Sequence, residues 1–382
     1  MSSFTYVGVS TADSWEVAGR EATIEAMSYI TNANKPKMLK IMYTEDAEPD
    51  DYKAIYKGLR SVSNDVIVIG GRVKYLYTSK GVLHKGVVVV ALNWDGELIE
   101  PILFHRDYDL NKIDEQFNQS IKSYQHDYEV TIYTLWSGFN YMMNVGEQWY
   151  NTFGPSINIF GGGCVEIAIE DQVYFDYGVA VAFLSKKRFE YVLGHGCQPE
   201  GRPLMITRAD KHNIYEIDGM SATEVYDQLC DDVTAKLGKK RDEGVEWSFS
   251  FGYPTVNGEY VLQEPVAINR ENDSIQMFLE IPDNSVVRIL VARSDTIFNK
   301  SVQLVDEYMN KFDNTPNFNL VINCVSRMDA LDYQFREKEL ALFKEHLGDN
   351  HFVGFSSIGE LGIPKGMPIY SHQKTLIIFG VS

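Results

Sequence analysis

A repeated order of strands and helices constrains the fold of this 382-residue chain more than any other feature of its sequence. Near the N-terminus, strand-like apolar runs alternate with helical stretches, and the same order returns near the C-terminus about 280 residues later. Self-similarity at a nearly constant offset is typical of a duplicated architecture. The first set of runs lies at residues 6–10, 39–43, 66–71 and 86–92, and the second at 287–291, 319–323, 352–357 and 374–380.

A partial copy lies between the two sets, because residues 157–163 and 178–184 resemble 66–71 and 86–92. The alternation of short β-branched runs with amphipathic stretches predicts an α/β (α+β) fold, in which duplicated mixed β-sheet units are flanked by helices. Each unit presents an apolar sheet face that it cannot cover alone, so the copies are expected to pack together. A turn-rich stretch at 196–202 and a helix starting near 221 predict a two-domain body, with domains at 1–220 and 221–382.

Charge and cysteine usage exclude several classes of function. The formal net charge of −18 disfavours nucleic acid as a partner. The four cysteines are scattered singly, so we expect reduced thiols and no metal site. No apolar run approaches the length of about 20 residues needed to cross a bilayer, and the N-terminus lacks the pattern of a signal peptide. We therefore expect a cytoplasmic protein with no membrane partner.

Eight short motifs follow one another along the chain. They are VGVST at 7–11, IGG at 69–71, FGGGC at 160–164, GHGCQP at 194–199, YEIDG at 215–219, CVSR at 324–327, GFSSIGE at 354–360 and HQKT at 372–375. In this order they resemble the FIST proteins, whose paired N- and C-terminal domains are regarded as intracellular sensory modules. The resemblance implies a receptor for a small cytoplasmic ligand, with amino acids the usual proposal and haem an alternative in some bacterial members. It fills the chain and leaves no kinase, cyclase or methyl-accepting segment, so the signal would pass to a separate partner protein.

Arg327 and Glu360 are the first candidates for ligand binding, because both follow predicted strands whose ends commonly border clefts. The arginine would grip a carboxylate through two parallel donors, while the glutamate would accept from an ammonium group. The alternative is a structural salt bridge between two loops.

The remaining ligand-binding candidates lie in the glycine-rich motifs. Backbone amides at Gly162 and Gly163 could face a carboxylate, although a tight turn explains the same residues. His195 and His372 both stand in motif loops, and His195 is either an axial haem ligand or a hydrogen-bonding side chain. Cys324, like the other cysteines, is either a nucleophile or a structural thiol.

Three functions follow from these residues. We favour a stand-alone sensor of a small zwitterion, with no catalytic residues and no cofactor. The alternatives are a haem-binding gas sensor and an enzyme that uses a cysteine. Aromatic residues at 139–150 serve either the core or an interface with a second copy of the chain.

Overall fold

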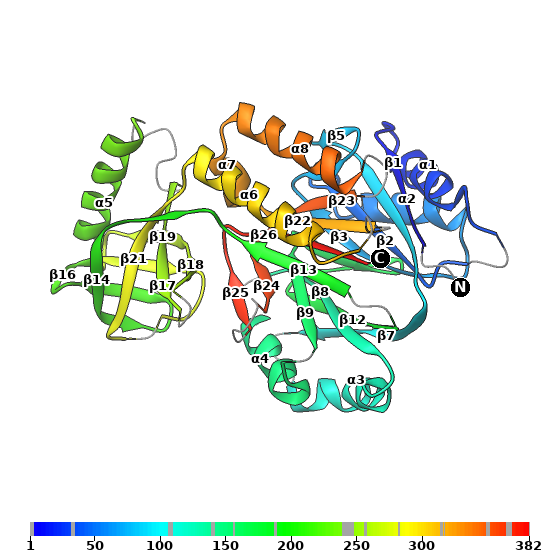
Figure 1. Ribbon diagram of the computed structural model, residues 1–382, viewed down its shortest axis with the longest axis horizontal. Helices are drawn as coiled ribbons and strands as arrows, with labels where there is room; N and C mark the ends of the chain where they lie inside the picture. The colour runs from blue at the N-terminus through cyan, green and yellow to red at the C-terminus, as the bar shows by residue number, and fades with distance from the viewer. Residues whose placement is uncertain are drawn as a thin grey trace.

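The computed structural model describes residues 4–31, 35–105, 110–138, 142–155, 157–186, 189–238, 248–255, 258–281, 283–313, 316, 318–348, 352–363 and 369–381. Three sheets with helices on their outer sides form one body, and a fourth sheet with a single helix projects from it (Figure 1). This arrangement confirms the α/β class and the helix-flanked mixed sheets predicted from the sequence.

Each of the three sheets in the body is built from a four-strand unit with the spatial order first, fourth, second, third. The second and third strands are parallel, and the fourth runs antiparallel to the second. Unit 1, in sheet A, consists of β1 (Phe4–Ser10), α1 (Trp15–Met27), β2 (Met38–Thr44), α2 (Asp51–Arg60), β3 (Ile67–Val73) and β6 (Val87–Asn93). Unit 2, in sheet C, consists of β7 (Gly96–His105), α3 (Leu110–Tyr124), β8 (Glu129–Trp136), α4 (Met142–Phe153), β9 (Asn158–Gly163) and β12 (Tyr177–Ser185). Unit 3, in sheet B, consists of β13 (Phe189–Gly194), α6 (Ser294–Met309), β22 (Phe318–Cys324), α7 (Val325–Ala330), α8 (Tyr333–Leu347), β23 (Phe352–Ser357) and β26 (Leu376–Val381).

The first strand of unit 3 differs from the prediction. It is β13, which pairs with β26 from Phe189 opposite Val381 to Gly194 opposite Leu376. The predicted strand at 287–291 belongs instead to the projecting sheet. The prediction was wrong because sheet D is inserted between the first strand of unit 3 and α6. The strand that precedes α6 in the sequence therefore belongs to sheet D and not to unit 3.

The middle copy is also more complete than predicted, because it has its own first strand, β7, and first helix, α3. Side chains of β7 are largely half-buried or exposed, so this edge strand lacks the continuous apolar run of the others. The aromatic stretch predicted at 139–150 corresponds in part to α4, and residues 139–141 lie outside the described residues.

A hairpin after the third strand of each unit pairs with the third strand of a different unit. Unit 1 thereby lends a hairpin to sheet B, unit 2 to sheet A, and unit 3 to sheet C. The three units are therefore joined in a closed ring of exchanged hairpins. The hairpins are β4–β5 (Leu76–Thr78 and Gly81–Leu83), β10–β11 (Glu166–Ile169 and Gln172–Tyr174) and β24–β25 (Glu360–Gly362 and Tyr370–His372).

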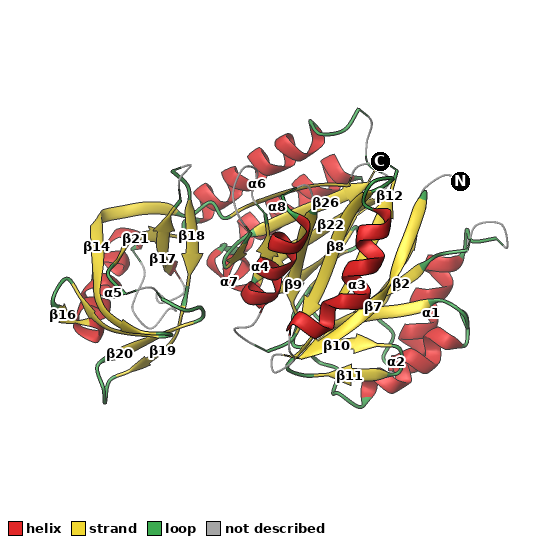
Figure 2. Ribbon diagram, turned by 90° about the horizontal axis from the view of Figure 1, so that it is seen from below, coloured by secondary structure: helices red, strands yellow, loops and turns green. Residues whose placement is uncertain are grey.

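The projecting sheet, sheet D, is inserted between β13 and α6 and packs against α5 (Figure 2). The boundary predicted between residues 220 and 221 falls within β16 of this sheet and stays a prediction. Sheet D and its helix consist of β14 (Gln198–Asp210), β15 (Asn213–Ile217), β16 (Met220–Ser221), α5 (Ala222–Leu237), β17 (Phe249–Pro254), β18 (Tyr260–Gln263), β19 (Pro265–Asn269), β20 (Ser274–Met277) and β21 (Ser285–Val291).

The inner faces of sheets A, B and C share one apolar core. Val88, Val181 and Ile377, one from the fourth strand of each unit, all point into it. Successive strand residues alternate between faces, so the neighbouring residues pack under the outer helices instead. Among the described residues, no helix combines the length and apolar character needed to cross a membrane.

Candidate functional site

Buried polar side chains gather where the ends of β22 and β23 meet the hairpin β24–β25 and the end of β18 from sheet D. They come from four separate stretches of the chain, and each is at most 8% exposed. Such a concentration of polar groups is unusual for a protein interior and marks a candidate functional site. We call it the junction cluster, and it consists of Glu264, Cys324, Ser326, Ser357, Glu360, His372, Lys374 and Thr375.

An ion pair between Glu264 and Lys374 joins sheet D to the three-sheet body. Lys374 is fully buried, and its Nζ contacts Oε1 of Glu264. The other oxygen of Glu264 accepts a hydrogen bond from Ser326 Oγ at 2.6 Å. The pKa of Lys374 is raised by the carboxylate against the opposing effect of its burial, which is the larger single contribution. The ammonium form of Lys374 is therefore favoured beside this carboxyl group, and an ammonium group carries three N–H donors.

Glu360 supplies the second carboxyl group of the cluster. Its Oε1 accepts from Ser357 Oγ at 2.5 Å, and its Oε2 accepts from Thr375 Oγ1 at 2.5 Å and from the Thr375 amide at 3.2 Å. Burial raises the pKa of this carboxyl to about 7, although the hydrogen bonds favour the ionised form. Glu360 therefore titrates close to neutral pH.

Glu360 occupies a position that is apolar in the other two exchanged hairpins. The third strands share a glycine at one register position, Gly70 in β3, Gly161 in β9 and Gly354 in β23. The hairpin residue paired with the position after this shared glycine is Glu360 in sheet C, Ile167 in sheet A and Leu76 in sheet B. Both apolar residues are fully buried in the central core. The fold therefore does not require a carboxyl group here, and its presence favours a functional role.

His372 lies directly opposite Glu360 on the paired strand, so both side chains leave the same face of the hairpin. The His372 ring forms a hydrogen bond with the backbone of Gly362, and no described residue is within hydrogen-bonding distance of its Nε2. Burial lowers the pKa of His372 to about 4, so the ring is neutral near pH 7. Its Nε2 is therefore an unused acceptor beside the Glu360 carboxyl.

Comparison with known families matches residues 39–220 to the FIST N domain and residues 222–363 to the FIST C domain. The chain belongs to the FIST family. FIST domains are sensory domains, and this membership indicates a role in signal transduction. The search of curated proteins returned no match.

Arg327 has its partners outside the junction cluster, although Cys324 and Ser326 of the same CVSR motif belong to it. Arg327 is fully buried beneath α6 and α8, where its Nη2 pairs with Glu339 Oε1 at 2.8 Å and contacts Ser301 Oγ at 2.5 Å. Its Nη1 donates to Asn323 Oδ1 at 3.0 Å. The guanidinium and the Glu360 carboxyl thus have separate sets of partners, and the arginine forms a buried ion pair between elements of unit 3.

The glycine run of β9 brings sheets B and C close together. A side chain at Gly162 would place its Cβ 2.8 Å from Ile322 Cγ2 and 3.1 Å from Ser357 Cβ. The Gly163 amide donates to the Gly359 carbonyl at 3.0 Å. Both glycines lie within a strand, without positive φ, so they form neither a tight turn nor a left-handed cradle.

His195 of the motif GHGCQP lies next to the junction cluster with both ring nitrogens in use. Its Nδ1 accepts from the Cys197 amide at 3.0 Å, and its ring also bonds to the Tyr260 backbone. Burial lowers the pKa of His195 to about 3, so the ring is neutral. An axial haem ligand needs a free ring nitrogen, and His195 in this arrangement does not fit that role.

Cys324 and Cys197 are protonated at neutral pH. Burial raises the pKa of Cys324 to about 12 and that of Cys197 to about 11. The thiolate is the nucleophile in cysteine chemistry, and these surroundings suppress it. Cys324 Sγ lies 3.3 Å from Ser326 Oγ, so it takes part in the polar network of the junction cluster.

The sequence thus predicted Glu360, His372 and Cys324 of the cluster but not the pair of Glu264 and Lys374. Lys374 lies two residues after His372 in the motif HQKT, and a lysine directly before an apolar strand is a signal that points to it. Glu264 is separated from Lys374 by 110 residues in sequence. No local pattern relates two residues at that distance, so their pairing could not have been predicted.

Proposed function

We propose that this FIST protein is a cytoplasmic sensor that binds a small zwitterion, such as an amino acid, at the junction cluster and signals through a separate partner protein. The observation that carries the proposal is the buried Glu360 carboxyl, which replaces the apolar residue of the two equivalent hairpins and lies beside an unused acceptor on His372. Buried polar groups that the fold does not need are typical of binding sites.

The chemistry of the cluster suits a molecule with one positive and one negative group. Glu360 and His372 Nε2 can both accept hydrogen bonds from an ammonium group. Lys374 carries three N–H donors, of which its contact with Glu264 needs one, so its ammonium group suits a ligand carboxylate. This assignment replaces the Arg327 clamp expected from the sequence, because Arg327 is already paired with Glu339.

The position of the cluster suggests how binding is transmitted. Glu264 comes from sheet D, whereas Lys374 and Glu360 come from the three-sheet body. A ligand that exchanges contacts with Glu264 and Lys374 would change the contact that holds sheet D against the body. Because only a differential affinity for two arrangements can shift their populations, the ligand must favour one placement of sheet D. A partner protein that binds only one placement of sheet D would then respond to the ligand.

A thermal-shift screen against the free amino acids tests the proposal. A ligand that binds only the folded chain raises its stability, by roughly 2.7 kcal/mol at 100 times the dissociation constant. We expect a saturable rise in melting temperature for the wild type, and loss of that rise in Glu360→Gln and in His372→Phe.

Glu166→Gln is the matched control, because Glu166 is also a buried carboxylate on an exchanged hairpin but pairs with Arg72 outside the cluster. This variant should keep the ligand-dependent shift. The proposal fails if no amino acid or similar zwitterion shifts the wild type, or if Glu360→Gln and Glu166→Gln respond alike. Circular dichroism of each variant separates loss of binding from loss of folding.

A further inference from the structure

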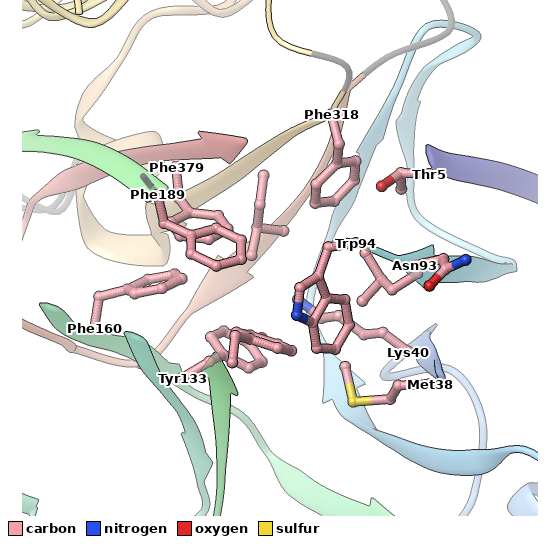
Figure 3. Close-up of a pocket in the computed structure, with 13 residues that line it drawn as sticks. Thr5, Met38, Lys40, Asn93, Trp94, Tyr133, Phe160, Phe189, Phe318 and Phe379 are labelled. Atoms are coloured by element: carbon pink, nitrogen blue, oxygen red, sulfur yellow. The ribbon is translucent and has the colours of Figure 1, made fainter. Parts of the chain in front are cut away.

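A second polar anomaly lies inside the apolar core between the three sheets. A cavity of about 30 Å³ opens there, large enough for a few non-hydrogen atoms (Figure 3). Its wall is almost entirely apolar and aromatic, and two polar residues, Thr5 and Asn93, lie at one end. The aromatic residues that line it are Trp94, Tyr133, Phe160, Phe183, Phe189, Phe318 and Phe379.

Lys40 is the single charged side chain among the described residues that line this cavity. It is 2% exposed, and no described residue is within hydrogen-bonding distance of its Nζ. The Nζ lies 4.7 Å from the ring centre of Tyr133 and 4.4 Å from that of Phe355. These rings offer a partial cation–π interaction, but no anion neutralises the ammonium group.

The fold does not demand a lysine at this position. Lys40 is on the second strand of unit 1, opposite the residue that precedes the shared glycine of the third strand. The equivalent position on the second strand is Tyr133 in unit 2 and Leu320 in unit 3. All three line the cavity. A leucine therefore satisfies the packing of this layer, and the amine of Lys40 needs another explanation.

We propose that Lys40 and the surrounding aromatic cavity form a second ligand site, which takes a short-chain carboxylate of a few carbon atoms. The carboxylate would lie against the Lys40 ammonium and supply the missing counter-charge. The alkyl part would lie against the aromatic wall. The small cavity excludes long acyl chains in the observed conformation, and the site is separate from the junction cluster, so it can bind whether or not that cluster does.

The charge state of Lys40 makes the site dependent on pH. Burial lowers the pKa of Lys40 to about 7, so the amine is largely neutral in alkaline solution. The titratable groups that face it are Tyr133 and Cys164, and burial raises the pKa of both, so they stay neutral across this range. Above pH 7 a carboxylate must first draw a proton onto Lys40, and its affinity should fall about tenfold per pH unit.

Propionate and its neutral isostere propionamide provide the test. Binding is followed by the melting temperature and by tryptophan fluorescence, since Trp94 lines the cavity. We expect saturable binding of propionate and none of propionamide in the same concentration range, with weaker propionate binding at pH 8.5 than at pH 6.5. Lys40→Met should abolish the effect, and Lys40→Leu, which introduces the residue found at Leu320, provides a second variant.

Lys37→Met is the matched control, because Lys37 also approaches Trp94, at 5.3 Å from its ring, but does not line the cavity. This variant and Glu360→Gln should both bind propionate as the wild type does. Equal binding of propionate and propionamide, or propionate binding that survives in Lys40→Met, would overturn the proposal. Because Glu360→Gln acts only on the zwitterion site, the two proposals can fail independently.

Discussion

Replacement of Lys40 by methionine should change how the stability of the protein depends on pH. Methionine keeps the length of the side chain and removes the amine from the apolar core. In the folded chain the pKa of Lys40 is lowered from 10.5 to about 7, so between these values the unfolded chain binds more protons than the folded one. The stability of the wild type therefore rises with pH in this window.

The size of the effect follows from the same two pKa values. The slope approaches about 1.4 kcal/mol per pH unit within the window, so the wild type should gain about 2 kcal/mol between pH 7 and pH 9 relative to Lys40→Met. Below pH 7 the disadvantage of the wild type is constant, because the amine is charged in both states. The difference between the unfolding free energies of the two proteins removes the contributions of other titrating groups.

Urea unfolding at pH 6, 7, 8 and 9 measures the difference directly. We expect Lys40→Met to be the more stable protein at pH 7 and its advantage to shrink steadily as the pH rises. Parallel stability curves for the two proteins would refute the reasoning, because they would mean that the amine is solvated or paired in the folded state.

Three further predictions concern the junction cluster and its neighbours. Burial raises the pKa of Glu360 to about 7, so between pH 4.5 and pH 7 the folded chain binds one proton more than the unfolded chain. The wild type should therefore lose about 3 kcal/mol of stability relative to Glu360→Gln as the pH rises through this window. Removal of one partner of the buried Arg327–Glu339 pair, by Arg327→Met or Glu339→Gln, should destabilise the chain by about 3–5 kcal/mol in chemical unfolding; a loss under about 1 kcal/mol would show that the pair is hydrated. Cys197 and Cys324 should resist alkylation in the folded protein and react after unfolding, and rapid labelling of either thiol in the native state would contradict their burial and raised pKa values.

The sequence predicted those parts of the fold that depend on local pattern. Apolar runs such as 66–71 and 86–92 were recognised because strand and turn signals repeat within a few residues. The first strand of unit 3 was assigned wrongly, because sheet D separates β13 from α6 by about 100 residues and no local signal records which strands pair across that insertion. Likewise, the exchange of hairpins between units depends on long-range pairing that the pattern does not encode.

The candidate site was predictable only in part for a related reason. Glu360 and His372 could be found because both stand in short motifs, and the structure pairs them on neighbouring strands. Lys40 was overlooked, although a lysine within the apolar strand at 38–44 is itself a signal for a buried charge. Arg327 drew attention as a ligand-binding residue, but Glu339, its partner, lies on a helix whose sequence looks like an ordinary charged surface.

The ring of exchanged hairpins implies that the body of the molecule assembles as a whole. Each unit completes the open edge of another, so a fragment that ends near residue 220 would lack β24 as the neighbour of β9, and would leave β4 without β23. A separately produced C-terminal fragment would in turn lose β13, the edge partner of β26. Exposed strand edges of this kind promote aggregation. The two halves that match the FIST N and FIST C domains therefore depend on each other for folding. A change at one exchanged hairpin is expected to affect the stability of all three sheets.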